Sequence, residues 1–438
     1  MLRISKKIQL KDAKTFKNKL LAWAQQFEEV VWLDANGHRD DNNAFDVILA
    51  VDAFTSIKTD TENAFEKLSE YQQTTKDWLF GYLTYDLKND TEKLTSTNFD
   101  GLCFPDLFFF QPKKIFIFRG NDLELLYLPL VDDEIDIDVE EIEKMRSTHP
   151  IEETHSATEN SKGVKIKLRI HKDEYRKKVE KMLWHIQRGD IYEANFCQEF
   201  YAENTTIDPL KTYQHLNDIS HPPFATFLKL EENYLLSASP ERYLKKEGNR
   251  IISQPIKGTS KRSKIAMHDY FLKHRLANDP KERSENVMIV DLVRNDLSKT
   301  AIKGSVKVEE LCRVYTFEQV HQMISTVVSE VDESTSPVDV IATTFPMGSM
   351  TGAPKVSAMR IIEDLEETKR GLYSGSVGYF TPKGDFDFNV VIRSILYNEG
   401  VKYVSYSVGG AITAKSIPER EYEECLIKAK AMREVLEG

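Results

Sequence analysis

The sequence predicts an α+β fold in which antiparallel strands and helices occupy separate stretches of the chain. Two runs of three strand patterns each are joined by short turns: 224–230, 234–239 and 250–253, then 374–381, 386–397 and 402–408. Helical patterns fill the sequence between the two runs. Because short turns join antiparallel strands, whereas parallel strands need long crossovers, this order favours packed antiparallel sheets over a doubly wound parallel one.

Length and composition are those of a large globular protein. The chain has 438 residues, of which 41% are hydrophobic and 29% are charged, and its formal net charge is -11. This length predicts two or three domains or one large unit. The negative charge disfavours a nucleic-acid partner. No apolar run reaches the ~18 residues needed to cross a bilayer, and residues 1–7 lack a secretory signal, so we expect no membrane association and a cytoplasmic location.

The first 130 residues alternate short apolar runs with turn signals. Strand patterns lie at 30–33, 45–51, 78–85, 107–110 and 114–118, and helical patterns lie at 11–27 and 60–75. The stretch from about 131 to 163 is acidic and then polar, which is typical of a linker. We therefore expect a boundary near residue 163, between an N-terminal region of residues 1–163 and a C-terminal domain of residues 164–438.

The four cysteines offer neither a metal site nor a nucleophile. Cys103, Cys197, Cys312 and Cys425 are far apart and show no paired ligand spacing. None lies in the Gly-x-Cys-x-Gly setting of a nucleophile elbow. We expect reduced thiols and no release of ammonia from glutamine by this chain.

Lys257 lies in the segment Ser253-Gln-Pro-Ile-Lys-Gly-Thr259, where a short strand is followed by a turn. Pro255 excludes a helix on the N-terminal side, and Gly258 allows a ligand to approach the backbone closely. An amine in this position is either a charge that binds a carboxylate or, where its proton is removed, a nucleophile. An isolated lysine is usually a solvated surface residue, so the interpretation depends on the other groups of this chain.

Two further segments carry acidic groups. Glu241 follows a predicted strand and could act as an acid or base with Arg242 as its orienting partner, or mark a surface corner. The stretch 281–296 predicts a buried helix, in which Glu285 either caps the first turn or binds a cation. Asp291 and Asn295 would share a buried face of this helix.

The last two groups contain candidate anion-binding residues. Thr351 lies just before a predicted helix at 356–366, whose free N–H groups would bind a carboxylate or a phosphate. Arg393 lies within a predicted strand, where an unpaired guanidinium is rare, so it requires a partner or a ligand. Glu424 and Lys428 share one helical face and are either an exposed ion pair or part of a site.

Taken together in this order, these segments resemble the chorismate-utilising enzymes over nearly the whole chain. The resemblance rests on Ser239-Pro-Glu-Arg, Pro255-Ile-Lys-Gly-Thr, the run Glu285 to Asp296, Thr351-Gly-Ala-Pro-Lys, Gly375-Ser-Val-Gly-Tyr and the run Glu424 to Ala429. Lysine in the Pro-Ile-Lys-Gly-Thr frame is similar to the aminodeoxychorismate synthase component I branch, whereas the anthranilate and isochorismate branches usually carry alanine there. The fold implied is that of anthranilate synthase component I, with packed antiparallel sheets and helices outside, and residues 164–438 would form the chorismate-binding catalytic domain.

The resemblance implies amination of chorismate at C4 with loss of its hydroxyl, giving 4-amino-4-deoxychorismate for 4-aminobenzoate and folate synthesis. Lys257 would attack C2, and Glu241 would be the acid or base at the departing hydroxyl. Glu285 and Glu424 would hold Mg²⁺ against a substrate carboxylate. The residues implied to line the substrate pocket are Gly258, Thr259, Thr351, Tyr379, Arg393, Gly409, Gly410, Ala411 and Lys428.

One departure from the family pattern predicts where the reaction ends. Many relatives have a histidine where this chain has Gln322, and here His321 comes one place early. That histidine is associated with proton removal in the anthranilate branch, so we expect the product to remain aminodeoxychorismate and a separate lyase to complete the pathway. Ammonia would come from a separate glutaminase subunit. The alternatives are anthranilate synthase component I, against which Lys257 argues, and a non-catalytic chorismate-binding subunit that regulates a glutamine amidotransferase.

Overall fold

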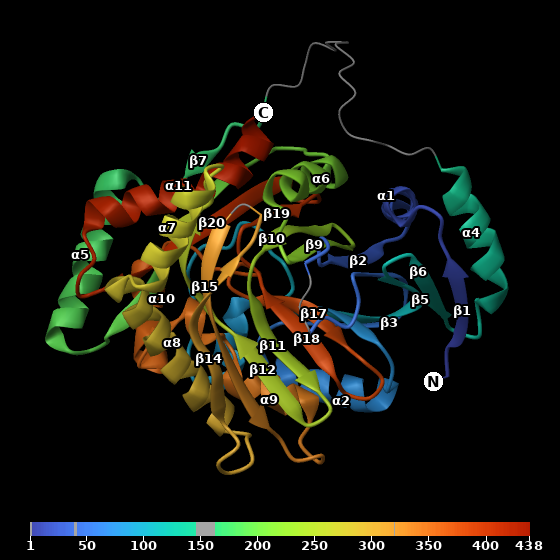
Figure 1. Cartoon of the computed structure of the whole chain (residues 1–438), viewed down its shortest axis with the longest axis horizontal. Helices are drawn as coiled ribbons and strands as arrows, with labels where there is room; N and C mark the ends of the chain where they lie inside the picture. The colour runs from blue at the N-terminus through green and yellow to red at the C-terminus, as the bar shows by residue number, and fades with distance from the viewer. Residues whose placement is uncertain (1, 39–41, 146–162, 319) are drawn as a thin grey trace.

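The computed structural model describes residues 2–38, 42–145, 163–318 and 320–438, and it confirms the α+β fold (Figure 1). Its strands are β1 (Ile4–Gln9), β2 (Glu29–Asp34), β3 (Val47–Thr59), β4 (Leu79–Leu83), β5 (Leu107–Arg119), β6 (Asp122–Tyr127), β7 (Lys167–Leu168), β8 (Glu193–Ala202), β9 (Phe224–Leu230), β10 (Asn233–Ser239), β11 (Arg242–Glu247), β12 (Arg250–Gln254), β13 (Ile256–Lys261), β14 (Lys307–Thr316), β15 (Val320–Glu330), β16 (Gly352–Ala353), β17 (Ser376–Phe380), β18 (Phe386–Val390), β19 (Ser394–Asn398) and β20 (Tyr403–Thr413). Its α-helices are α1 (Ala13–Trp23), α2 (Ala64–Thr75), α3 (Lys88–Thr91), α4 (Ile135–Lys144), α5 (Lys172–Arg188), α6 (Pro209–Ser220), α7 (Ala266–Ala277), α8 (Pro280–Ser298), α9 (Pro337–Thr344), α10 (Lys355–Leu365) and α11 (Pro418–Glu437), and four short 3₁₀ turns are η1 (Ala24–Gln26), η2 (Tyr85–Leu87), η3 (Asp132–Glu134) and η4 (Gly348–Met350).

The strands form one hydrogen-bonded network that divides at the long strand β5. One arm runs through β3, β2, β9, β10, β19, β20 and β8. The other arm runs through β4, β17, β18, β11, β12 and β15. Strand β13 pairs with β15 along the edge that β12 also occupies, and β14 pairs with the opposite edge of β15. All of these pairings are antiparallel, as the short turns of the sequence predicted.

Two hydrophobic clusters account for the layers. One cluster joins both arms, with Val31 and Leu228 from the first and Val327 and Phe388 from the second. Alternate residues of the first arm point to its other face, where they pack against α1, α4, α6 and α11. Figure 1 shows α1 and α4 at one end of the molecule and α5, α7, α8 and α10 at the other. The sheets thus form the interior and the helices the outside.

The N-terminal region is built into the same sheets as the rest. Strand β2 pairs with β9, and β4 pairs with β17, so strands from both sides of residue 163 are hydrogen-bonded to each other. The boundary at residue 163 stays a prediction. The start of the predicted linker is helical in the structure, because α4 occupies 135–144. Asp138 on this helix forms an ion pair with Lys114 of β5. Its later part, 146–162, lies outside the described residues.

Helix α8 differs from its prediction in a way that matters for the site. It begins at Pro280, and the side chain of Asp279 before it accepts hydrogen bonds from the backbone N–H groups of Lys281 and Glu282. Asp291 and Asn295 are exposed, whereas Asn286 and Asp296 are buried. The prediction of a buried Asp291 face was wrong, because the packed side of the helix is set by its contacts with β13, β14 and β15. No helix in the described part of the chain is long and apolar enough to cross a membrane.

Candidate active site

Lys257 projects from an irregular point of β13. The pairing of β13 with β15 shifts register between Ile256 and Thr259, and Gly258 in between has a φ of 92°, a conformation that favours glycine. The irregularity re-aims the lysine, whose side chain is only 14% exposed and whose Nζ lies 3.8 Å from Oε1 of Glu193. The amine is therefore a sheltered, paired group and not a solvated surface residue.

Glu241 is buried beside the same segment. Its carboxyl accepts hydrogen bonds from the Ser349 side chain and from the backbone of Ile256, and it feels the charge of Lys257. Burial outweighs these stabilising contacts and raises the pKa of Glu241 to about 7. A carboxyl group with this pKa exchanges protons near neutral pH, as an acid or base at a leaving hydroxyl must.

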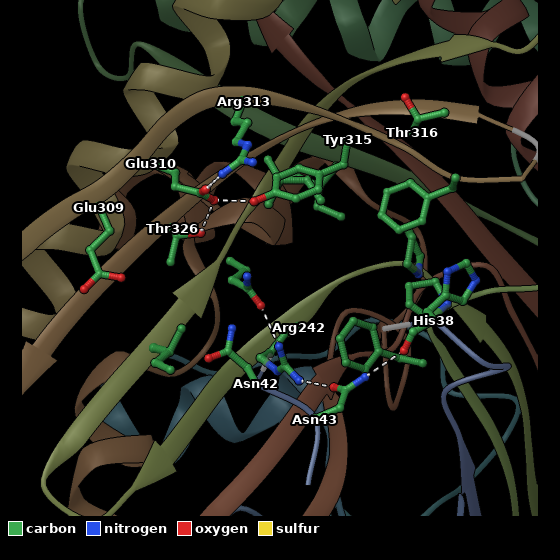
Figure 2. A pocket seen from close by; sticks show the side chains of 18 of the residues that line it. His38, Asn42, Asn43, Arg242, Glu309, Glu310, Arg313, Tyr315, Thr316 and Thr326 are labelled. Atoms are coloured by element: carbon green, nitrogen blue, oxygen red, sulfur yellow. Dashed lines mark hydrogen bonds and ion pairs between the residues drawn. The ribbon is translucent and has the colours of Figure 1, made fainter. Parts of the chain in front are cut away.

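Arg242 does not orient Glu241, because it lies on the other face of the sheet. Its guanidinium donates to Asp387 at 3.0 Å, to Gln254 at 2.6 Å and to Asn43 at 2.7 Å. Arg242, Gln254 and Asn43 line a cavity of about 960 Å³, and Figure 2 shows Arg242 at one side of it. Successive residues of an extended chain point to opposite faces, so Glu241 and Arg242 are separated. This large cavity is thus distinct from the Lys257 cluster.

The short strand β16 brings the Thr351-Gly-Ala-Pro-Lys segment against Glu193 at the start of β8. Gly352 pairs with Ala194, and a Cβ at Gly352 would lie 2.2 Å from the carbonyl oxygen of Glu193, so only glycine allows this approach. Thr351 is buried, and its hydroxyl donates to the carbonyl of Gly348 at 3.2 Å. The segment therefore forms a rigid wall of the site.

Glu285 on α8 and Glu424 on α11 belong to the same charged cluster. The ammonium groups of Lys257 and Lys281 act on both carboxyls, and Lys281 lies 3.7 Å from Glu285. Burial raises the pKa of Glu285 to about 7, partly offset by these two lysines. Burial would also raise the pKa of Glu424, but Lys428, at 2.7 Å, together with Lys281 and Lys257, outweighs this effect and the net shift is downward. Two acids from distant segments thus share one set of cations.

The donor chemistry of this cluster fits Mg²⁺. Carboxylate oxygens are the ligands this ion prefers, and Oε1 of Glu285 is buried without a hydrogen-bond partner among the described residues. As the side chains stand, the described residues contain no group of three or more histidine, cysteine or acidic side chains close enough to hold a metal ion. The lysines supply the cationic charge in this arrangement, so a bound ion would compete with Lys281 for Glu285.

Arg393 is placed to bind an anion. It lies between β18 and β19 with a φ of 53°, so the predicted continuous strand over 386–397 is broken at this residue. Its guanidinium makes no hydrogen bond or ion pair with the described residues, while Tyr373 and Glu424 are its electrostatic neighbours. Burial lowers the pKa of Arg393. A sheltered guanidinium without a partner favours a ligand carboxylate.

Strand β20 and helix α11 complete the cluster. Lys428 donates to the carbonyl of Gly409 at 2.9 Å, which ties the helix to the strand. A Cβ at Gly410 would lie 3.7 Å from both Glu424 and Lys428, so the backbone of β20 borders the charged groups. Ala411 follows, opposite Asn195 of β8, and Thr259 is exposed beside Gln322.

Tyr379 is placed apart from this cluster. Its ring packs against Phe45, Trp78 and Phe80 with centroids 5.4 to 5.8 Å apart. The charge with the largest effect on its hydroxyl is that of Asp387, on the Arg242 side of the sheet. Tyr373, before strand β17, is the tyrosine that is an electrostatic neighbour of Arg393.

Comparison with known proteins identifies the family to which the chain belongs. The sequence matches the model of the chorismate binding enzymes over residues 26–434. It is 31% identical over 388 residues to aminodeoxychorismate synthase component 1 of Bacillus subtilis, covering 88% of this chain and 80% of that relative. The chain belongs to the chorismate binding enzymes.

Other members of this family lie at similar distances. Anthranilate synthase component 1 of Thermus thermophilus is 34% identical over 359 residues, covering 82% of this chain and 77% of that relative. The crystal structure of anthranilate synthase component I from Streptococcus pneumoniae has a TM-score of 0.76 at 24% identity and covers 91% of this chain and 94% of that one. At this identity the structural likeness establishes the fold of the chorismate binding enzyme and no more.

Four charged or polar residues of this chorismate binding enzyme were missed by the sequence analysis: Glu193, Glu282, Tyr373 and Glu421. Glu282 and Glu421 each precede a predicted acid by three residues on the same helix, a spacing that signals a shared face. The charge of Lys281 acts on both. Glu193 and Tyr373 carry no local signal, because only the pairing of distant strands brings them to the cluster.

Proposed function

We propose that the chain is component I of an aminodeoxychorismate synthase, which replaces the C4 hydroxyl of chorismate with an amino group derived from ammonia. The observation that carries the proposal is the sheltered amine of Lys257 beside Glu193 and Glu241. A lysine that served only as a surface charge would not need this enclosure. The names of the relatives from Bacillus subtilis and Escherichia coli support the same activity.

In the proposed reaction, neutral Lys257 forms a bond to C2 of chorismate. The two ring double bonds shift, the C4–O bond breaks, and the hydroxyl leaves as water with the proton of Glu241. Ammonia then attacks C4, the double bonds shift back, and Lys257 leaves C2 as a neutral amine. Glu241 recovers its proton from the new ammonium group, so the reaction consumes chorismate and ammonia and yields 4-amino-4-deoxychorismate and water.

The remaining groups of the cluster bind and orient the substrate. Arg393 pairs with a substrate carboxylate, and the backbone of Gly409 to Ala411 borders the ring. Glu285 and Glu424 would hold Mg²⁺, which neutralises a substrate carboxylate when bound. Gly258, Thr259 and Thr351 shape the wall beside Lys257. For Tyr379, the position in the aromatic core points to a packing role, and Tyr373 is the better candidate for the pocket.

Ammonia in this proposal comes from a glutaminase partner. Burial raises the pKa of Cys197 to about 12 and that of Cys425 to about 11, so these thiols are poor nucleophiles. Several relatives are named as component 1, which implies a second component. A separate lyase would act on the product, for folate synthesis, and the cytoplasmic location expected from the sequence is part of the same proposal.

The product formed from chorismate, ammonium and Mg²⁺ tests the function. We expect the purified chain to form 4-amino-4-deoxychorismate, identified by chromatography and mass spectrometry. Anthranilate as the product would assign the chain to the other branch, which the Thermus thermophilus relative represents. Unchanged chorismate at all ammonium concentrations would support a non-catalytic subunit instead.

A further inference from the structure

Glu193 is the carboxylate in direct ionic contact with Lys257. The residue is only 2% exposed, and its Oε1 lies 3.8 Å from the lysine Nζ. Its other oxygen, Oε2, is buried without a hydrogen-bond partner among the described residues. A buried carboxylate with a spare oxygen, held against an amine, is poised to exchange a proton with that amine.

The proposed reaction requires such a group. A lysine ammonium has no free electron pair, so Lys257 must lose a proton before it can attack carbon. Four other carboxyls feel the charge of Lys257: Glu241, Glu282, Glu285 and Glu424. Any of them is a formal candidate, and the contacts of each decide between them.

The other carboxyls are engaged elsewhere. Glu241 is hydrogen-bonded to Ser349 and to the backbone of Ile256, and the proposed reaction needs it protonated as the acid. Glu285 pairs with Lys281, and Glu424 with Lys428. Among the acids facing Lys257 in the described structure, Glu193 is the one found within 4.0 Å of its amine.

We propose that Glu193 is a catalytic base that takes the proton from Lys257 as the amine attacks C2 of the substrate. This inference rests on the proposed function. The N–H bond of the ammonium breaks, the proton passes to the Glu193 carboxylate, and the freed electron pair forms the N–C2 bond. When Lys257 later leaves C2 as a neutral amine, Glu193 returns the proton, so the pair ends as it began.

The fold supports this role in two ways. The start of β8 is fixed by β16, since Gly352 allows the two backbones to approach closely, so the carboxylate has little freedom to move away. Burial also raises the pKa of Glu193, although the charge of Lys257 opposes this shift. The higher pKa makes the carboxylate a stronger base. In a site with little water, the ion pair loses hydration. The free energy of the neutral acid and amine, relative to that of the ion pair, is therefore lower than it is in water.

The first test measures how fast the covalent adduct forms. Wild-type chain and Glu193→Gln are mixed with chorismate without ammonia, and the Lys257 adduct is quantified by rapid quench and mass spectrometry. We expect the variant to be slower by about 10²-fold or more at pH 7. Omitting ammonia removes the titration of the co-substrate from the measurement.

The pH dependence separates a base from a structural role. In the wild type, the rate rises on the acid side as the Glu193 carboxyl loses its proton, and it falls on the basic side as Glu241 loses its proton. In Glu193→Gln the proton must leave to solvent, so the reaction needs an amine that is already neutral together with a protonated Glu241. Both limbs of the pH profile should therefore move upward toward the range of a lysine side chain, by roughly two pH units or more. Glu193→Asp, which can still accept a proton, should keep the wild-type profile at a reduced rate.

Three outcomes would overturn the inference. The first is adduct formation by Glu193→Gln at the wild-type rate, and the second is a slower rate with an unchanged pH profile. A control is Glu199→Gln, also on β8, whose carboxylate binds Arg169 and Tyr403 away from the site. The third is a shift of the pH profile in this control equal to that in Glu193→Gln, because it would show that the shift follows disruption of β8.

A second measurement does not depend on catalysis. Fluorodinitrobenzene reacts with the neutral amine of lysine. The pH dependence of labelling at Lys257 in the full chain therefore reports the fraction of this amine that is neutral. Loss of the neighbouring carboxylate should lower the pH of half-maximal labelling by about 1 to 3 units in Glu193→Gln. No change would refute the pairing whatever the chain catalyses. Absence of product and adduct in the wild type would instead refute the proposed function, with which the base role would fall.

Discussion

Glu241→Gln should stabilise the protein while it removes activity. The carboxyl is buried, and its pKa rises from the usual 4.5 to about 7 in the folded chain. Folding therefore favours the protonated form, and ionising the group costs stability. The contribution of this group to the free energy of unfolding is fully present below pH 4.5 and is lost as the pH rises through 7.

The size of the effect follows from the two pKa values. A difference of about 2.5 pH units at about 1.4 kcal/mol each gives about 3 kcal/mol at full ionisation. Glutamine cannot ionise, and its amide can keep a hydrogen bond with Ser349. The variant should therefore gain about 1 kcal/mol in free energy of unfolding at pH 5 and about 3 kcal/mol at pH 8.

Urea unfolding at the two pH values measures this gain. Glu180→Gln, an exposed acid on α5, is the matched control and should show no comparable pH-dependent gain. Turnover of Glu241→Gln should fall by about 10²- to 10⁴-fold, because the amide cannot donate a proton to the leaving hydroxyl. A variant that is no more stable than wild type at pH 8 would show that Glu241 is not held protonated by burial.

Four further predictions concern the site and its support. Lys257→Arg keeps the charge but loses the nucleophile, so turnover should fall roughly 10⁴-fold or more while chorismate still binds, and near-normal turnover would exclude covalent catalysis. Glu285→Gln and Glu424→Gln should each need more Mg²⁺, with excess Mg²⁺ restoring part of the activity; full activity of both in chelator-treated buffer would contradict the metal site. The isolated chain should use ammonium at alkaline pH but not glutamine, and glutamine-dependent turnover by the pure chain would contradict a separate glutaminase. Arg370→Met leaves the buried carboxylate of Glu366 without its ion-pair partner and should lower the free energy of unfolding by about 3 to 5 kcal/mol, measured in urea, whereas an unchanged value would show that this pair contributes little.

The sequence by itself determined the elements and the chemical types of the site. Short turns between strand patterns predicted antiparallel sheets. The segments containing Lys257, Glu241, Glu285 and Glu424 supplied candidate groups, and the resemblance to the chorismate-utilising enzymes joined these groups into one site. These features are local: a turn, a strand end or one helical face is encoded within a few residues, so reading along the chain finds them. Glu282 and Glu421 belong to this class as well, because helical spacing places them beside predicted acids.

Only the tertiary structure decided which face each strand residue occupies and which distant groups meet. Arg242 and Tyr379 lie away from Lys257, and Arg393 interrupts a predicted strand, because side chains alternate across a sheet and one irregular residue reverses the alternation. Glu193 meets Lys257 only because β8 pairs with β16 and β20 while β13 pairs with β15. Such contacts depend on strand register over long separations, for which no neighbouring residues provide a signal, and they supply the carboxylate on which the lysine chemistry is proposed to depend.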